Sequence, residues 1–485
     1  MKLMDKNYLK IWGWLLVISA IFLSVFSWST SPIFKVYGND SAVFIVMGKA
    51  LAAGKVLYKD VFDHKGPILF FIEALGQLIW SGRMGIFLIQ ILNLTVVLYL
   101  ARKISLLFVT QKQSWLVICA ALIFLVRPLD EGNMTEELSL AFIMLPVFLA
   151  LKDFLQPQSI HPTKNTFIYG LCFTIIAFIR ITNAVAIVAI VFSIILSLIM
   201  EQRWRLLWKH AGVFIGASLV VILPLFAFFY SQDTLYDMLY GTFLFNLKYI
   251  NIGRTSFTNW AFLLPYLYAL VISFYSAVGA YLYCKQSPNK LLLSFAICLS
   301  LLSIYVSLSG FLFLHYQTIN LVLVVLGVAF TFANLKNRSL RKMQYGLNIL
   351  VLMGLSLPLF YFTRDYIQEI SVRYTHGIKV HNYPEIKIPQ EDKDQVIAYN
   401  VQANWYLDQN VLPCYKYFVH QDWWGDFAPT VWDDFNKMMI ENSPLWIITP
   451  KAIKNTELEK ILQKNYNIHP SSNDDYIVYT LKETI

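Results

Sequence analysis

Two short acidic motifs follow the first long apolar run of the sequence. The first is GNDS, at residues 38–41, and the second is DVFDHKGP, at residues 60–67. A carboxylate in such a motif can act as a general base, while histidine and lysine can hold a phosphate group. The candidates for this chemistry are Asp40, Asp60, Asp63, His64 and Lys65.

Both motifs also have a purely structural interpretation. Asp40 precedes the helix-forming run SAVFIVMGKALAAG and fits its N-cap. The second motif has the composition of a solvated, lysine-rich turn that Gly66 and Pro67 close. For Asp40 the two interpretations stay balanced, because a second acidic cluster follows it and carboxylates beside membrane pathways are usually functional.

Further candidates lie at the ends of apolar segments or between them. An arginine beside a membrane span is costly unless it is paired or hydrated, so each such arginine is a site candidate. The alternative is an interface anchor, since long basic side chains snorkel to the membrane surface and aromatic residues gather there. These candidates are Arg127, Arg180, Arg254, His315 and Tyr316.

The composition indicates which elements must position these side chains. Of the 485 residues, 57% are hydrophobic and only 14% are charged, whereas soluble proteins carry roughly 25% charged residues. A membrane-spanning helix needs about 20 mostly apolar residues. The chain is therefore predicted to be a polytopic α-helical membrane protein, with eleven spans near 11–29, 84–101, 114–127, 136–151, 166–180, 183–200, 211–230, 260–283, 291–310, 316–334 and 345–362.

The distribution of lysine and arginine predicts the orientation of these spans. The segment 66–80 has only fifteen residues and includes Glu73 and Gln77, so we expect it to lie at the membrane surface. The cytoplasmic loops then hold seventeen basic residues and the outer loops ten. Six of these ten lie in the first outer loop, which departs from the positive-inside rule, while the other loops follow it. In this orientation the outer face holds both the candidates of the two acidic motifs and those that lie at the ends of apolar segments or between them. The N-terminus is inside and the C-terminus outside.

The C-terminal part has a different composition. Residues 363–485 carry a net charge of −5, against +14 for the rest. Strands are predicted at 395–400, 414–419, 444–450 and 475–481, with helices at 428–442 and 455–465. We therefore expect a transmembrane module at 1–362, with surface helices in the outer loop 30–83, and a small extracytoplasmic α/β domain at 363–485.

The first-loop motifs resemble those of the membrane-embedded GT-C glycosyltransferases. The similar members are the bacterial enzymes related to protein O-mannosyltransferases and the lipid A aminoarabinose transferase. GNDS stands where these enzymes have an acidic motif, and VFDHKGP stands where the mannosyltransferases have a Phe-Asp-x-His-Pro-Pro-like motif. The aminoarabinose transferases carry a Lys-Pro segment at this second place, to which HKGP is similar. Ser41 and Gly66 depart from the mannosyltransferase pattern, which leaves the acceptor less defined than the reaction class.

The resemblance implies a reaction and a role for each candidate. The donor would be a sugar on a polyprenyl phosphate, and Asp40, which matches the catalytic acid of the family, would act as general base in an inverting displacement. The leaving phosphate would be held by Lys65, Arg127, Arg180 and Arg254. Supporting or acceptor-binding roles would fall to Asp60, Asp63, His64, His315 and Tyr316.

The sequence also indicates which cofactors and partners to expect. The chain has no nucleotide-binding motif, so no nucleotide site is assigned. Asp60, Asp63 and His64 could ligate a divalent cation, but their spacing is no recognised metal signature, so no cofactor is assigned. The partners would be membrane lipid, a polyprenyl-phosphate-linked sugar and a cell-envelope acceptor (a polysaccharide, teichoic acid, glycolipid or protein), with no nucleic acid. The expected location is the cell membrane, as in a bacterial cytoplasmic membrane. The alternatives are a transporter or flippase for lipid-linked glycans, or a non-catalytic scaffold.

Overall fold

The computed structural model describes residues 6–34, 36–156, 161–248, 264–308, 313–375 and 383–482. The chain divides into two compact units, each built from segments that are far apart in the sequence. The first unit contains Met1–Ser27, Ile89–Phe228 and Gly253–Ile370, and the second contains Trp28–Leu88, Phe229–Ile252 and Ser371–Ile485.

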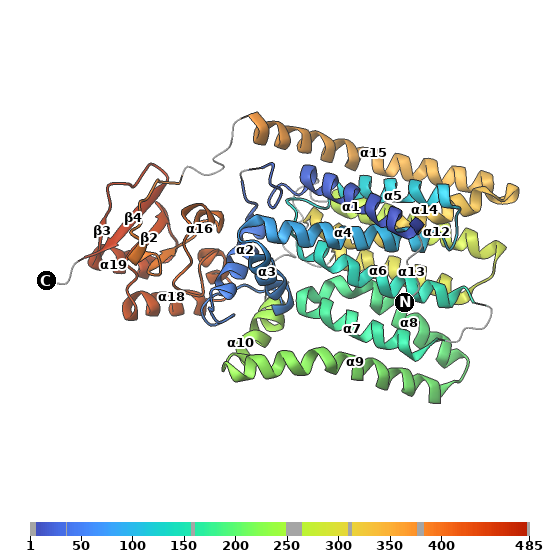
Figure 1. Cartoon of the computed structure of the whole chain (residues 1–485), viewed down its shortest axis with the longest axis horizontal. Helices are drawn as coiled ribbons and strands as arrows, with labels where there is room; N and C mark the ends of the chain where they lie inside the picture. The colour runs from blue at the N-terminus through green and yellow to red at the C-terminus, as the bar shows by residue number, and fades with distance from the viewer. Residues whose placement is uncertain are drawn as a thin grey trace. The chain divides into compact units, whose positions relative to one another are not determined.

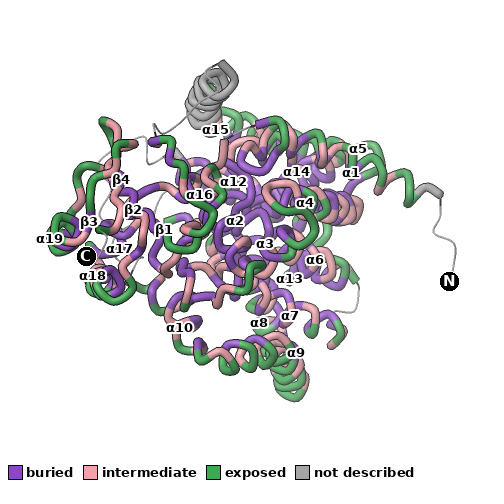
Figure 2. Tube along the Cα trace, turned by 60° about the vertical axis from the view of Figure 1, so that its left-hand side comes forward, coloured by how far each residue is buried: buried purple, intermediate pink, exposed green. Residues whose placement is uncertain are grey.

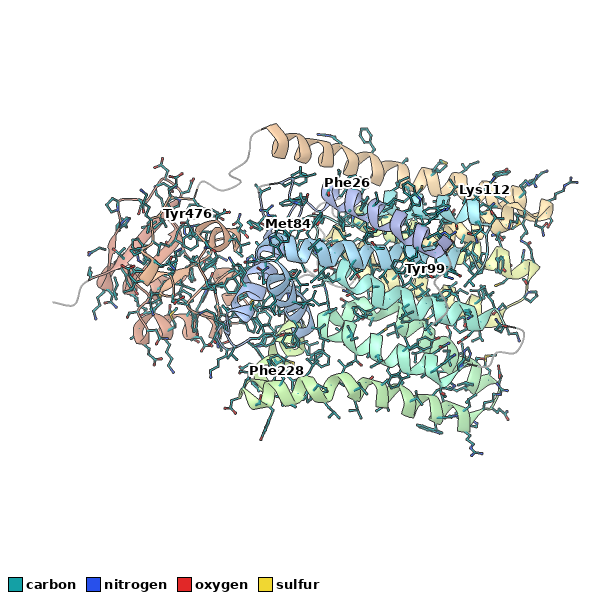
Figure 3. The ribbon with its side chains drawn as sticks, in the orientation of Figure 1. Phe26, Met84, Tyr99, Lys112, Phe228 and Tyr476 are labelled. Atoms are coloured by element: carbon teal, nitrogen blue, oxygen red, sulfur yellow. The ribbon has the colours of Figure 1, made fainter. Side chains whose placement is uncertain are left out.

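The first unit consists of long helices. They are α1 (Lys6–Phe26), α4 (Arg83–Ser105), α5 (Gln111–Leu125), α6 (Thr135–Phe154), α7 (Thr163–Arg180), α8 (Val185–Met200), α9 (Trp204–Ser231), α12 (Leu264–Gln286), α13 (Lys290–Leu308), α14 (Leu321–Leu335) and α15 (Arg338–Thr375). The short helices η1 (Ile181–Ala184) and η4 (Leu314–Asn320) precede α8 and α14. Several of these helices pack through aromatic rings, as where Tyr99 of α4, labelled in Figure 3, stacks on Trp12 with centroids 4.6 Å apart.

Seven segments among the described residues are long and apolar enough to cross a membrane. They confirm a multi-pass helical protein, while the predicted number of eleven spans and their orientation stay predictions. One segment, Thr163–Met200, covers two of the predicted spans. Three predicted spans fall outside the seven: those in α5, which has only 15 residues, in α6, which has charged residues at both ends, and in α15. Burial differs between the seven: 78% of the span that includes α14 is buried but only 17% of α9, which Figure 2 shows largely in green and pink.

The second unit combines short helices with a small sheet. Its helices are α2 (Asn39–Ala52), α3 (Pro67–Ile79), α10 (Leu235–Leu239), η2 (Tyr240–Leu244), η5 (Gln390–Asp392), α16 (Asn404–Gln409), α17 (Gln421–Gly425), α18 (Thr430–Glu441) and α19 (Thr456–Asn465). The strands are β1 (Val396–Ala398), β2 (Trp446–Pro450), β3 (Tyr466–Ile468) and β4 (Tyr476–Leu481), in the order β1-β2-β4-β3. Figure 1 draws these strands with α18 and α19 in orange to red. Strand β1 is parallel to β2, and the other two pairs are antiparallel.

The α/β character of the C-terminal part is confirmed, with two differences in the strands. The predicted strand at 414–419 is wrong, because this segment is irregular and its carbonyl groups bond outside the sheet: Lys416 O accepts from Phe62 N and Tyr417 O from the Gln421 side chain. The three-residue strand β3 was not predicted. The irregular segment matters below, since it joins the C-terminal part to the first loop.

Close packing of α2 against α3 shapes the first loop. A Cβ atom at Gly48 of α2 would lie 2.6 Å from the Cβ of Glu73 on α3, far inside contact distance. Glycine at this position therefore lets the two backbones approach, and Glu73 becomes fully buried. The predicted surface segment 66–80 is the helix α3, which begins with Pro67 at a position where a missing N–H costs nothing.

Candidate active site

Asp40 lies in the first turn of α2 and does not cap it. The N-cap residue is Gly38, and no side chain forms a capping hydrogen bond there. Within the residues that the structure describes, the Asp40 carboxylate accepts no hydrogen bond from the protein, and it is partly exposed. The alternative in which Asp40 only caps a helix is therefore wrong, and its carboxylate stands at the positive end of the helix dipole.

The turn at residues 63–65 is held by its own side chains. Asp63 Oδ1 accepts a hydrogen bond from Lys65 N at 3.0 Å, and Asp63 Oδ2 lies 3.8 Å from His64 Nδ1. Lys65 Nζ lies 2.8 Å from His64 Nε2, and 5.9 Å from the centre of the Phe44 ring on α2. The turn is not the solvated surface that the alternative interpretation expected, since Asp63 is 4% exposed and His64 is 8% exposed.

Burial acts on the ionisation of Asp63. It raises the pKa of this carboxyl, while the charge of Lys65 and its backbone N–H oppose the rise and the negative charge of Asp40 adds to it. The interaction with Asp40 places the two acidic motifs of the sequence in one electrostatic neighbourhood. They therefore form one cluster within the second unit.

Groups outside the turn, some from distant parts of the chain, fix its backbone. Asn246 Nδ2 donates to His64 O at 2.7 Å, and Tyr58 Oη donates to Lys65 O at 2.8 Å. Phe62 N donates to Lys416 O at 3.0 Å. Asn246 was not assigned to the site from the sequence, because its loop shows no local pattern that marks one amide among several polar residues.

Asp60 has a structural role at the start of the same loop. Its Oδ2 accepts a hydrogen bond from Val56 N at 2.7 Å, and its own N–H donates to Val56 O at 2.8 Å. These two bonds close the turn 56–60. The carboxylate of Asp60 is thus engaged, whereas that of Asp40 is open.

The C-terminal part adds His420, which sequence reasoning missed. Its ring centre lies 5.9 Å from that of Trp424, and the Trp424 ring lies 6.4 Å from His64 and 5.6 Å from Phe62. Burial lowers the pKa of His420, the charges of Asp40 and Asp63 oppose this, and Lys65 adds to it. No motif in the sequence marked His420, since it follows a segment that the apolar pattern assigned to a strand.

In the first unit, Arg180 and Tyr316 come together. Arg180 Nη1 donates to Glu136 Oε1 at 2.5 Å, and the guanidinium lies 3.9 Å from the centre of the Tyr316 ring. Thr135 Oγ1 donates to the other oxygen of Glu136 at 2.8 Å. The pairing of Arg180 agrees with the high cost of an unpaired arginine in an apolar environment.

His315 lies beside Tyr316 and contacts a second carboxylate. Its Nδ1 is 3.2 Å from Asp130 Oδ2, and its ring centre is 4.7 Å from that of Tyr316. Asp130 has a positive φ of 56°, which is uncommon outside glycine. One cluster thus contains the candidates Arg180, His315 and Tyr316. Arg127 is near this cluster in the sequence, since it precedes Asp130 by three residues.

The acidic residues at the start of α6, Glu136 and Glu137, were visible in the sequence but were not assigned to the site. Glu137 is 2% exposed and accepts hydrogen bonds from Gln90 Nε2 at 2.9 and 3.0 Å and from Asn133 N at 2.8 Å. These bonds hold the loop that carries Asp130. Arg254 lies outside the described residues.

Among the described residues, no group of three or more His, Cys, Asp or Glu side chains is placed to hold a metal ion. The second unit instead presents an open carboxylate, Asp40, near a lysine and two imidazoles. Such a set can remove a proton and stabilise negative charge. The first unit presents a paired arginine beside an aromatic ring and a histidine.

Comparison with solved structures identifies the fold. Two crystal structures of ArnT from Cupriavidus metallidurans are similar to the chain at 12% sequence identity, one in the apo state and one bound to undecaprenyl phosphate. The alignments cover 96% and 97% of this chain and 97% and 98% of ArnT, with TM-scores of 0.52 and 0.53. The Archaeoglobus fulgidus oligosaccharyltransferase, in complex with Zn and sulfate, is also 12% identical over 96% of this chain and 73% of that chain, but its TM-score of 0.49 adds no support.

No protein-family model and no curated protein matches the sequence. The similarity to ArnT nevertheless extends over almost the whole length of both chains. It shows that the chain shares the fold of ArnT, in agreement with the resemblance of the first-loop motifs.

Proposed function

We propose that this chain is an integral-membrane glycosyltransferase that moves a sugar from a polyprenyl phosphate to a cell-envelope acceptor. The fold is shared with ArnT, of which one structure is bound to undecaprenyl phosphate. The observation that carries the proposal is the open carboxylate of Asp40, at the place where the resemblance puts the catalytic acid. The neighbouring carboxylates of Asp60 and Asp63 are both used by the fold.

The proposed chemical step is a single displacement with inversion. Asp40 takes the proton of the acceptor hydroxyl, whose oxygen forms a bond to the anomeric carbon. The bond from this carbon to the phosphate oxygen breaks, and its electron pair leaves with the polyprenyl phosphate. The acceptor becomes the glycoside and Asp40 becomes a carboxylic acid, which then loses its proton to solvent.

Negative charge grows on the phosphate as it leaves, so cations must face it. Lys65 suits this role because its ammonium carries three donors and lies in the same cluster as Asp40. One terminal nitrogen of Arg180 donates a hydrogen bond to Glu136. The guanidinium has five N–H donors in all. Its role and those of Arg127 and Arg254 at the phosphate stay predictions.

The function is tested with purified protein in proteoliposomes that contain a radiolabelled pool of polyprenyl-phosphate sugars. A cell-envelope fraction supplies the acceptors outside, and labelled glycoside is measured after the lipid donor is extracted. Transfer of label supports the proposal. Movement of the lipid-linked sugar between leaflets without transfer would contradict it and favour a flippase, the main alternative.

A further inference from the structure

The segment before α17 holds one residue in an uncommon backbone conformation. His420 has a positive φ of 56°, in the left-handed region that residues with a side chain rarely adopt. Such positions cost free energy and persist only where neighbouring contacts determine them. Such conformations occur disproportionately at functional sites. The contacts that hold His420 in this conformation are therefore of interest.

The residues that follow His420 are tightly bound to the C-terminal sheet region. Gln421 is fully buried, and its amide nitrogen donates to Ala398 O at 2.9 Å and Tyr417 O at 2.7 Å. Asp422 accepts from Tyr399 Oη at 2.5 Å and from Lys454 N at 3.0 Å. The backbone at residue 420 is therefore imposed by the anchoring of its neighbours.

The same segment is bound to the turn that carries the acidic cluster. Phe62 N donates to Lys416 O, and the Phe62 ring lies 5.3 Å from that of Tyr417 and 5.6 Å from that of Trp424. The centre of the Trp424 ring lies 5.9 Å from that of His420 and 6.4 Å from that of His64. The position of His420 relative to the turn is thus fixed by both backbone and ring contacts.

The imidazole of His420 differs from the other polar side chains of this neighbourhood. His64 Nε2 lies within hydrogen-bond distance of Lys65 Nζ, and Asp63 Oδ1 accepts a hydrogen bond from the Lys65 amide. Among the described residues, neither ring nitrogen of His420 forms a hydrogen bond with the protein, and the side chain is partly exposed. Asp40 is open in the same way, and its charge acts on His420.

We propose that His420 binds the acceptor hydroxyl and orients it toward Asp40, so that the C-terminal domain completes the reaction site. Burial lowers the pKa of His420, which keeps the imidazole neutral near pH 7. A neutral imidazole has one N–H donor and one acceptor nitrogen. The N–H donates to the hydroxyl oxygen while Asp40 accepts the hydroxyl proton, and His420 itself exchanges no proton.

This inference rests on the proposed glycosyl transfer and makes a separate prediction about its kinetics. Loss of one hydrogen bond to the acceptor costs about 0.5–1.5 kcal/mol, or about two- to twelvefold in binding. In His420→Ala, the amount of cell-envelope fraction that gives half-maximal transfer should rise by about this factor, with the half-saturating donor concentration unchanged. His420→Gln, which keeps an amide donor and acceptor, should recover part of the loss.

The control is His469→Gln, in the same domain. His469 already bonds Ser471 within its own loop, so this substitution should leave both kinetic constants unchanged. Unchanged acceptor dependence in His420→Ala would overturn the inference. Equal losses for donor, acceptor and thermal stability, without recovery in His420→Gln, would also overturn it, since they would indicate a structural role only.

The two proposals fail in different ways. An inactive wild-type protein would overturn the proposed function, and the acceptor role of His420 with it. An active wild type whose Asp40 variant is inactive but whose His420 variants are normal would leave the function standing and overturn only the role of His420.

Discussion

Two aspartates of the first loop, similar in sequence, have opposite environments. Asp40 is partly exposed and makes no protein hydrogen bond within the described residues, whereas Asp63 is 4% exposed and bonds the backbone of its own turn. An open carboxylate can accept a proton from a substrate, and a buried one mainly shapes the chain. The sequence motifs found both residues but could not distinguish these roles, because burial depends on contacts with residues 416–424.

The buried aspartate predicts a dependence of stability on pH. Burial raises the pKa of Asp63 above its ordinary value, so the folded protein holds this proton more tightly than the unfolded chain does. The free energy of unfolding then falls as pH rises from the unfolded pKa through the raised folded pKa. Asp63→Asn keeps Oδ1 for the Lys65 amide and cannot ionise. As the pH rises from 4 to 8, we expect the thermal midpoint of Asp63→Asn in detergent to fall by less than that of the wild type.

A parallel pH dependence of the two proteins would contradict this account of Asp63. The exposed Asp433→Asn is the matched control, because an exposed carboxylate should leave the wild-type dependence intact. The comparison isolates the effect of burial from that of charge removal alone.

At the scale of elements, the packing of α2 on α3 sets the position of Asp40. The sequence predicted helix in both segments, but it could not show that Gly48 is the point of closest approach. This information lies in the pairing of two helices, which no periodicity along one of them reveals. The missed strand β3 and the wrong strand at 414–419 have a similar cause, since hydrogen bonds to other segments of the chain decided both.

Gly48→Ala should destabilise the first loop and misplace Asp40. The added Cβ would stand 2.6 Å from Glu73 Cβ and 2.8 Å from the Glu73 carbonyl carbon, so the helices must separate. Overpacking of this kind costs about 1–3 kcal/mol, and we expect a lower thermal midpoint together with slower transfer. Gly13→Ala is the control, because no atom lies within 4 Å of its new Cβ. Equal thermal midpoints of Gly48→Ala and Gly13→Ala would show that the close approach of α2 and α3 at Gly48 does not affect stability.

At the scale of the whole chain, three segments far apart in the sequence form the second unit. Residues 28–88, 229–252 and 371–485 assemble together, and the bond from Asn246 to His64 joins residues 182 positions apart. The sequence predicted a membrane module followed by a separate small domain. It could not predict that the domain contributes His420 to the cluster around Asp40, because this depends on docking of an irregular segment.

The charge distribution predicts the orientation of the chain in the membrane. The segment 336–342, at the start of α15, holds four basic residues, whereas the C-terminal part is acidic, so this segment should be cytoplasmic and the C-terminus outside. A reporter that is active only outside the cytoplasm should be active when fused to the C-terminus and inactive when inserted between α14 and α15. The opposite pattern would move Asp40 and His420, which share a unit with the C-terminus, to the cytoplasmic side.

The central claim is that Asp40 is the general base of a glycosyl transfer, and one comparison tests it directly. Wild type, Asp40→Asn and the control Asp433→Asn are assayed for transfer from radiolabelled polyprenyl-phosphate sugars and, in parallel, for binding of polyprenyl phosphate. A positioned base contributes about 100-fold or more to the rate. We therefore expect Asp40→Asn to bind the lipid like the wild type and to transfer at least about 100-fold more slowly, while Asp433→Asn transfers normally. Normal transfer by Asp40→Asn would contradict the account and move the search for the base to Asp63 or to the acidic residues 130–137.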